Sequence, residues 1–322
     1  MTTISAARLG GFFLRWLGAI FAPRTPAEAP RPPASPPAPA LATPRDVQER
    51  LIALGLLDPP ADGALGPLSR WALAEACRSV GAVISDEQLS GSVPTPALCD
   101  ALARASPLPL KPGDDLAGRI VRAMLARGHF LARHPECLNI VYVEGLDPDG
   151  TPNDNAPNQF NDLRCLIRIV DGVPRLAGAW EATTEPSRRW TLAPLNPKGA
   201  ARIAFGQYKS WAVGTHVGPS GNDPHEALIQ CAPIDVYRDS KKDFKREGPT
   251  FTGIFGINQH WGYDQPKDDV GTASAGCLVG EKRDGHRAFM AVVKSDPRFR
   301  ANNGYKFMTA VVPGHEALAP VG

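Results

Sequence analysis

A proline-rich stretch at residues 23–44 divides this chain of 322 residues into two unequal parts. It contains nine prolines and six alanines. Proline lacks the backbone N–H that helices and central strands require, and alanine buries little apolar surface, so this stretch cannot pack a core. We therefore expect a semi-rigid polyproline-type linker between whatever precedes it and whatever follows it.

A short apolar helix is predicted before the linker, at residues 1–22. Its apolar residues recur at helical spacing: Leu9, Phe12, Phe13, Trp16, Leu17, Ile20 and Phe21. The run is shorter than the ~20 residues that span a bilayer, and Arg15 interrupts it. A cleaved signal peptide and a helix buried in the fold are both alternatives. Since no small-x-small cleavage pattern precedes the prolines, we favour an uncleaved membrane anchor, either a signal anchor or an interfacial helix.

The composition indicates a globular protein of about two domains. Hydrophobic residues make up 43% and charged residues 21%, and the net charge is +2. A charge this small gives no case for nucleic-acid binding, which normally requires a concentrated basic patch. The six cysteines form no CxxC pair and no Cys/His cluster, so we expect no structural zinc. Cys77 and Cys99 lie close enough in sequence to pair, and a disulfide and two reduced thiols both remain open.

Residues 45–110 are predicted to form a small helical module. Val47, Leu51 and Leu54 mark one apolar helix face, the turn "DPPADG" ends it, and Pro67 begins a second helix. The pattern resembles the peptidoglycan-binding type 1 module. The matching residues are Val47, Gln48, Leu51, Leu54, Gly55, Asp62, Gly63, Gly66, Pro67 and Ser69. The alternative is a helical pair that only spaces the two ends of the chain.

From residue 138 the pattern changes from helical to strand-like, which makes the fold class α+β: a small helical module followed by a mainly β domain. A connecting helix is expected within residues 111–137, and the β domain within 138–314, with a tail at 315–322. Short runs rich in β-branched and aromatic residues predict strands at 138–145, 163–170, 175–184 and 227–238. Turn-forming residues predict a long surface loop at 147–161, and a helix is expected near 285–295. We expect a mixed or antiparallel sheet or barrel.

The segment "SAGC" at 274–277 has the features of a nucleophilic turn. A thiol reacts as thiolate and needs a nearby base or positive charge, which His260 can supply. Gly276 permits a sharp turn, so the backbone amides around Cys277 are candidates for binding an oxyanion. One cysteine and one histidine at this separation are weak evidence alone, since a lone cysteine is usually a buried small side chain.

The histidine, a gap of about 15 residues and then Ser-x-Gly-Cys resemble the active-site signature of the L,D-transpeptidase (YkuD-like) family. The resemblance implies that Cys277 is the nucleophile, that His260 is the base, and that Ser274, Ala275 and Gly276 form the motif and oxyanion hole. Most members have histidine at the position of Ala275 and arginine at that of Val279. This divergence resembles a separate proteobacterial branch that makes 1-3 cross-links, whereas the broader family implies 3-3 cross-links.

Further residues near predicted strand ends are candidates for binding a stem peptide. They are Trp180, Glu181, Thr183, Tyr208, Lys209, His216, Trp261 and Gly262. Each of them, taken alone, is equally well explained as a structural residue. The group that orients His260 is Asp264, Asp268, Ser274 or a backbone carbonyl, and the sequence does not choose among them.

These resemblances imply a periplasmic cysteine transpeptidase, held at the inner membrane by its N-terminal helix and acting on peptidoglycan stem peptides. No cofactor and no metal are expected, because cysteine acyl transfer needs neither. Two alternatives stay open. One is an L,D-carboxypeptidase or endopeptidase, in which water resolves the thioester. The other is a catalytically silent wall-binding protein.

Overall fold

A computed structural model describes residues 41–90, 94–218, 221 and 223–319. The helices are α1 (Pro44–Ala53), α2 (Pro67–Ser79), α3 (Asp86–Ser90), α4 (Pro96–Arg104), α5 (Leu116–Ala126), α6 (Arg188–Leu192), α7 (Arg283–Lys294), α8 (Pro297–Ala301) and α9 (Gly314–Ala317). The strands are β1 (Asn139–Glu144), β2 (Asp162–Val170), β3 (Val173–Thr183), β4 (Ala200–Ile203), β5 (Gly206–His216), β6 (His225–Gln230), β7 (Ile234–Asp239), β8 (Phe251–Gly253), β9 (Gln259–Trp261), β10 (Leu278–Gly280) and β11 (Phe307–Pro313).

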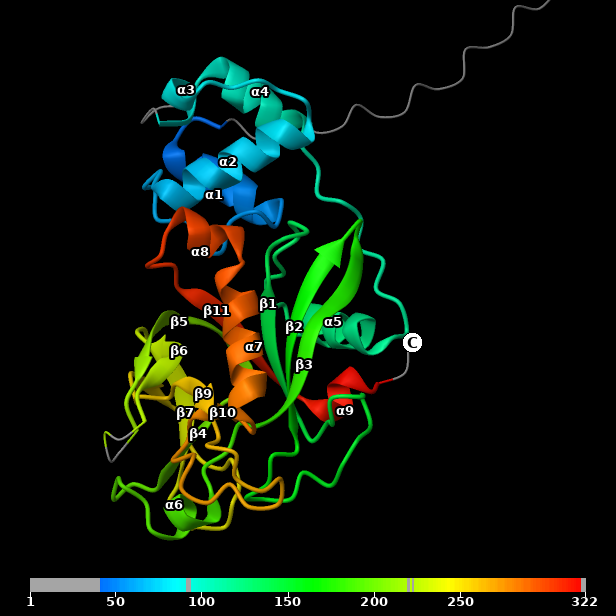
Figure 1. The fold of residues 1–322 in the computed structure, drawn as a ribbon. Coiled ribbons are helices and arrows are strands. Elements are labelled where there is room, and N and C mark those ends of the chain that lie inside the picture. The colour runs from blue at the N-terminus through cyan, green and yellow to red at the C-terminus, as the bar shows by residue number, and fades with distance from the viewer. Residues whose placement is uncertain (1–40, 91–93, 219–220, 222, 320–322) are drawn as a thin grey trace, which may run out of the picture. The chain divides into compact units, whose positions relative to one another are not determined.

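Eight strands close into a barrel in the order β1-β11-β5-β6-β9-β10-β3-β2 (Figure 1). The pairs β1–β11 and β9–β10 are parallel, and the other neighbours are antiparallel. The remaining strands form a separate sheet in the order β4-β7-β8. The α+β fold class, with helices first and a mainly β domain after them, is therefore confirmed. Of the expected sheet types, the main sheet is a barrel with both parallel and antiparallel pairs.

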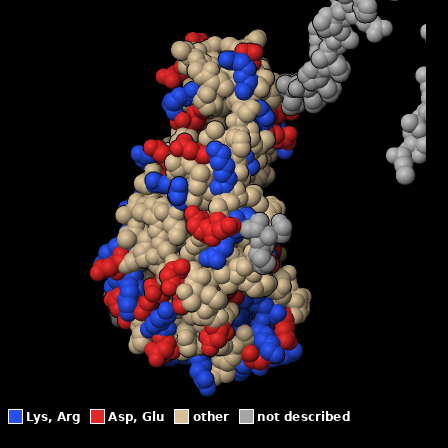
Figure 2. Space-filling view, turned by 90° about the vertical axis from the view of Figure 1, so that its right-hand side faces the viewer, with Lys and Arg blue, Asp and Glu red and all other residues tan. Residues whose placement is uncertain are grey.

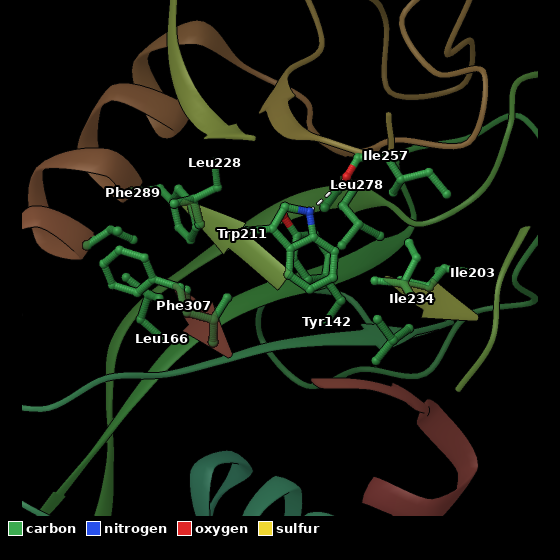
Figure 3. Packing of buried hydrophobic residues seen from close by; sticks show 14 of the residues in the cluster. Tyr142, Leu166, Ile203, Trp211, Leu228, Ile234, Ile257, Leu278, Phe289 and Phe307 are labelled. Atoms are coloured by element: carbon green, nitrogen blue, oxygen red, sulfur yellow. Dashed lines mark hydrogen bonds between the residues drawn. The ribbon is translucent and has the colours of Figure 1, made fainter. Parts of the chain in front are cut away.

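The barrel interior is filled by large apolar side chains (Figure 3). Trp211 of β5 is fully buried there, and its indole Nε1 donates a hydrogen bond of 2.8 Å to the Ile257 carbonyl. That bond satisfies the polar edge of an otherwise apolar side chain. It also ties the chain just before β9 to the barrel wall, so the core fixes the position of the segment that leads to His260.

A second apolar layer lies outside the barrel, beneath α5. Because side chains alternate along a strand, Ile140 and Tyr142 of β1 point into the barrel while Val141 and Val143 point outward. The outward residues of β1, β2 and β11 pack against one face of α5. Both faces of these strands are thus buried, which explains why β1 reads as a nearly continuous hydrophobic run.

The helices α1, α2 and α4 share a core of their own. The loop between α1 and α2 is held by Gln48, whose Nε2 donates to Asp62 Oδ1 at 2.7 Å and to Ser69 Oγ at 3.1 Å. Its Oε1 accepts from the Gly63 amide at 2.6 Å. Four residues of the peptidoglycan-binding-like pattern therefore form one internal hydrogen-bond network. Their presence in the sequence is explained by the stability of this loop, without a ligand.

Asp58, in the turn after α1, makes a buried contact with the barrel domain. Its carboxylate accepts from Arg298 Nη1 at 2.7 Å and from the Tyr305 hydroxyl, and Lys209 Nζ lies 3.7 Å away. Asp58 and Arg298 are nearly inaccessible to solvent. Breaking a buried pair of this kind by removing one partner leaves an uncompensated charge.

The predicted loop at 147–161 is found between β1 and β2, and it is partly buried. Phe160 is fully buried at its end, and the Phe160 amide donates to the Lys267 carbonyl at 2.8 Å. All six cysteines are free thiols, so Cys77 and Cys99 do not form a disulfide.

The predicted anchor at 1–22 lies outside the described residues, as does the linker at 23–44 up to residue 40. None of the helices in the described part of the chain has the length and apolar content that a membrane crossing requires.

Replacing Gln48 by alanine should lower the free energy of unfolding of the helical region by about 1–3 kcal/mol, because Asp62, Ser69 and the Gly63 amide lose their common partner. Urea unfolding followed by circular dichroism measures the change. Glu49→Ala, at an exposed position of the same helix, is the matched control and should change stability by less than about 0.5 kcal/mol. Equal losses in the two variants would contradict the role of the network.

Candidate active site

The turn Ser274–Cys277 is fixed by hydrogen bonds and by a close backbone approach. Ser274 Oγ donates to the Cys277 carbonyl at 2.9 Å and accepts from the Gly276 amide at 3.2 Å. Gly276 has φ +130°, and a Cβ there would lie 2.5 Å from the Ala201 carbonyl oxygen. Only glycine fits this position without a shift of backbone. The Gly276 amide, a predicted oxyanion-hole donor, is occupied by Ser274 in this arrangement.

Cys277 lies at the end of that turn, half-buried beside the segment that leads into β9. Its Sγ accepts a hydrogen bond from the Asn258 amide at 3.4 Å and lies 3.5 Å from the Gly256 carbonyl, to which it donates. The thiol opens into a pocket of about 340 Å³. Other residues lining the pocket include Trp190, Asn196, Ala201, Arg238, Phe255 and Ala275. Burial raises the pKa of the Cys277 thiol to about 11, against the opposing effect of the Asn258 amide.

A small apolar cluster supports the turn from below. Phe160, Val270 and Val279 are fully buried in it, and Cys277 and Tyr263 pack against it. Val279 stands where most members of the resembled family have arginine. In this chain that position faces Phe160 and has no access to solvent, so the packing here requires an apolar residue.

His260 lies on β9, which pairs in parallel with β10 so that His260 is opposite Val279. Its Nδ1 donates to the Trp261 carbonyl at 2.7 Å, which places the proton of the neutral ring on Nδ1 and leaves Nε2 as a base. The sequence left four candidates for the group that orients His260, and in the structure this group is a backbone carbonyl. Asp264 instead binds Arg283, and Ser274 binds the turn. Burial, reinforced by His216, holds the pKa of His260 well below its ordinary value.

Four of the seven histidines, His260 included, form one cluster. His216 stacks on His260 with ring centroids 3.9 Å apart, and His225 lies 5.9 Å from His260 and 5.8 Å from His286. Protonation of one ring is disfavoured by burial and by its neighbours. Burial, and after it the nearby His225, lowers the pKa of His216 to about 4. Burial, and after it the nearby Arg164, lowers the pKa of His286 to about 3. The cluster is therefore neutral at pH 7.

Asn258 connects this cluster to the thiol. Its backbone amide donates to Cys277 Sγ, and its side-chain Nδ2 lies 3.1 Å from His216 Nδ1, to which it donates. His216, one of the predicted substrate-binding residues, is thus next to both the predicted base and the thiol segment. The arrangement brings Cys277, Asn258, His216 and His260 into one contiguous group.

The other predicted substrate-binding residues on β3 lie away from the pocket. Trp180 packs edge-on against Phe289, 5.8 Å between ring centroids, and Thr183 is buried opposite Val279 in the ladder. Glu181 lies on the same strand and lines no part of the Cys277 pocket. Their contacts are those of barrel-wall residues.

The candidates on β5 and after β9 also have structural contacts. Tyr208 donates from its hydroxyl to the Ala204 carbonyl at 3.0 Å, and Lys209 reaches Asp58. Trp261 stacks on His225 with centroids 3.7 Å apart. Gly262 donates to the Gly280 carbonyl at 2.6 Å, and a Cβ there would meet Phe160. None of these candidates lines the Cys277 pocket, and of them His216 is connected to the thiol segment through Asn258.

Sequence reasoning missed Asn258, Arg238 and the histidines His225 and His286. Asn258 precedes His260 by two residues in a short strand entry, a spacing that places both on one face, and this was a usable signal. Arg238 comes from a different sheet, and no local pattern connects it with Cys277.

Within the described residues, no group of histidine, cysteine and acidic side chains has an arrangement that could hold a metal ion. His216 and His260 stack on each other, and the Nδ1 atoms of His260 and His286 are engaged by the Trp261 carbonyl and by Arg164.

Charges of both signs alternate over the face shown in Figure 2. Lysine and arginine side chains there are interspersed with aspartate and glutamate, which fits the net charge of +2. That face offers no extended basic surface of the kind nucleic-acid binding uses.

Comparison with known proteins gives little guidance. No family model matches the chain, and no curated protein matches it. One solved structure from Clostridium acetobutylicum ATCC 824, a fused Zn-dependent amidase/peptidase/peptidoglycan-binding domain-containing protein, is 12% identical. The alignment covers 83% of this chain and 93% of that one, with a TM-score of 0.25. A similarity this low supports no conclusion about architecture or activity.

Gly276→Ala should cost about 1–3 kcal/mol of stability, because alanine is strained at φ +130° and its Cβ meets the Ala201 carbonyl. The same shift should alter the rate at which iodoacetamide alkylates Cys277, measured by peptide mass spectrometry. Gly113→Ala, where a Cβ meets open space, is the control and should leave both unchanged. A Gly276→Ala protein with wild-type stability and labelling would show that the turn tolerates a side chain.

The buried histidines should make stability fall as the pH drops from about 6.5 towards 4. In the unfolded chain they take up protons near pH 6.5, whereas in the folded chain His216 does so only near pH 4, so the unfolded state binds more protons in this range. Urea midpoints at pH 7 and pH 5 measure the fall. It should be smaller in His216→Gln and unchanged in His315→Gln. Identical pH dependence in wild type and His216→Gln would rule out this contribution.

Proposed function

We propose that the protein is a cysteine acyltransferase acting on peptidoglycan, an L,D-transpeptidase with Cys277 as nucleophile and His260 as base. The observation that carries the proposal is the pairing of a pocket-lining thiol on a tight glycine turn with an adjacent strand whose histidine has Nδ1 tied to a carbonyl. This is the tautomer that a general base requires, because Nε2 is then free to accept a proton.

The resting site contains a neutral thiol and a neutral imidazole. The pKa of Cys277 is raised and that of His260 is lowered, both by burial, so an ion pair between them is disfavoured before substrate binds. Thiolate therefore forms as attack proceeds, with the proton moving from Sγ to His260 Nε2. This differs from a site that stores a thiolate beside a permanent cation.

The reaction proceeds in two acyl transfers. The Cys277 sulfur attacks a stem-peptide carbonyl, the amide C–N bond breaks, and His260 returns the proton to the departing amine, leaving a thioester. The side-chain amine of a second stem then attacks the thioester, gives its proton to His260 and displaces the thiol. With the Gly276 amide bonded to Ser274, we assign the oxyanion to the Cys277 amide at the end of the same turn.

The N-terminal helix, the linker and the helical module also support a function at the cell wall. We propose that the N-terminal helix anchors the protein at the inner membrane, that the proline-rich linker extends it into the periplasm, and that the helical module contacts peptidoglycan. This rests on the sequence pattern described above. The product is a 3-3 cross-link or, by the resemblance to the divergent branch, a 1-3 cross-link.

Incubation of the full-length chain with purified sacculi or muropeptides, followed by mass spectrometry, tests the proposal. Wild type should give cross-linked dimers whose fragmentation identifies the donor residue. Cys277→Ala should give none, and His260→Ala should be slower by about 100-fold or more, the usual contribution of a general base. Cys231→Ala, another partly buried free cysteine, is the matched control and should keep full activity.

The other outcomes separate the alternatives. Shortened monomers that require Cys277 would show that water resolves the thioester and that the protein is a hydrolase. Undiminished wall binding without any product would refute the enzymatic proposal and leave a wall-binding protein.

A further inference from the structure

Arg238 of β7 reaches the Cys277 pocket from the second sheet. In the β4–β7 ladder Arg238 is directly opposite Ala201, so both side chains leave the sheet on the same face. The Ala201 backbone and Cβ are the atoms that crowd Gly276. Arg238 and Cys277 accordingly line the same pocket.

The Arg238 guanidinium has no acidic partner among the described residues. Its Nη1 donates to the Gly199 carbonyl at 3.3 Å, and the guanidinium carbon lies 5.0 Å from the centre of the Phe255 ring. Within the part of the chain that the structure describes, no ion pair involves Arg238, although it is half-buried. Partial burial lowers the pKa of Arg238, consistent with a cation that lacks an anion nearby. Arginine is well suited to hold a carboxylate through two parallel hydrogen bonds.

A second hollow, of about 410 Å³, adjoins the first at Arg238. Its lining contains four basic and three acidic side chains. Asp239 accepts from two backbone amides and Asp243 from one, and Glu247 pairs with Lys241 at 2.5 Å. Positive charge is therefore in excess in this lining.

Lys198 adds to that positive charge at the boundary of the two hollows. It lines the second hollow, and the next residue, Gly199, lines the first. Its Nζ lies 5.4 Å from the centre of the Phe251 ring, and none of the described acidic side chains forms an ion pair with it.

We propose that Arg238, supported by Lys198, is the binding site for a carboxylate of the peptide that reacts with Cys277. The inference rests on the proposed function and adds the recognised group: a free carboxylate on the stem peptide, lying where the two hollows meet. Arg238 is a binding residue in this scheme and takes no part in proton transfer.

Alkylation of Cys277 by two small reagents tests the site without requiring transpeptidase activity. Iodoacetate carries a carboxylate, and iodoacetamide is its neutral analogue of nearly equal size. The rate constants of both reagents at Cys277 are measured on the full-length protein by peptide mass spectrometry, and their ratio is compared between variants. The ratio cancels any change in thiol pKa, because both reagents need the same thiolate.

Arg238→Gln should lower the iodoacetate-to-iodoacetamide ratio about threefold or more, and high salt should lower the wild-type ratio in the same direction. Arg238→Lys should retain most of the ratio, since the charge is kept. Arg104→Gln, an exposed arginine on α4, makes the same change in net charge and should leave the ratio at the wild-type value.

An unchanged ratio in Arg238→Gln overturns the inference, as does a Cys277 that neither reagent labels. The outcome is independent of the sacculus assay. If the ratio depends on Arg238 but the protein makes no cross-links, the anion site is supported and the proposed reaction is rejected. If the protein makes cross-links but the ratio does not depend on Arg238, the reaction is supported and the anion site is rejected.

Discussion

The candidate site depends on the parallel pairing of two strands of three residues each, β9 and β10. These strands close the barrel between β6 and β3, and β9 meets β6 in a single ladder pair, Leu228 with Gln259. So short a ladder cannot fix a strand alone. Gln259 adds a 2.8 Å bond to Thr309 inside the barrel, and Trp211 holds the Ile257 carbonyl. The interior packing therefore sets the relative position of His260 and the turn that precedes β10.

Burial gives this site its electrostatic character. Arg164, fully buried at the barrel wall, stacks 4.3 Å from the centre of the Phe289 ring, and its Nη1 donates to His286 Nδ1. His286 in turn donates from Nε2 to the Glu226 carbonyl at 2.9 Å, so its neutral ring has one donor and one acceptor, both engaged. Because His286 is neutral, it places no positive charge beside the other histidines of the cluster. The low dielectric that disfavours their protonation also disfavours a resting thiolate, so burial both lowers the pKa of His260 and raises that of Cys277.

The parts of the fold with local signals were predictable. Short runs rich in β-branched and aromatic residues indicated β1, β2 and β3, Pro67 marked the first residue of α2, and the motif around Cys277 indicated the turn at Ser274–Cys277. The histidine cluster was not predictable, because His216, His225, His260 and His286 come from three strands and a helix, and only barrel closure brings them together. The positions of the substrate-binding candidates relative to the Cys277 pocket were not predictable for a similar reason. A strand end in sequence does not tell which side of a closed barrel a side chain faces.

The charge distribution around the pocket constrains how the reaction can begin. Thiol and imidazole are both neutral in the resting state, and Arg238, a cation without an ion-pair partner among the described residues, belongs to the other sheet. In the proposed scheme a carboxylate bound at Arg238 would cancel much of that positive charge and leave little to stabilise a thiolate in advance. The proposed attack would then be coupled to proton transfer to His260, whose Nδ1 is held by the Trp261 carbonyl. In this scheme Arg238 binds the substrate and His260 activates the thiol. The two residues lie on different sheets, which meet where Ala201 contacts Gly276.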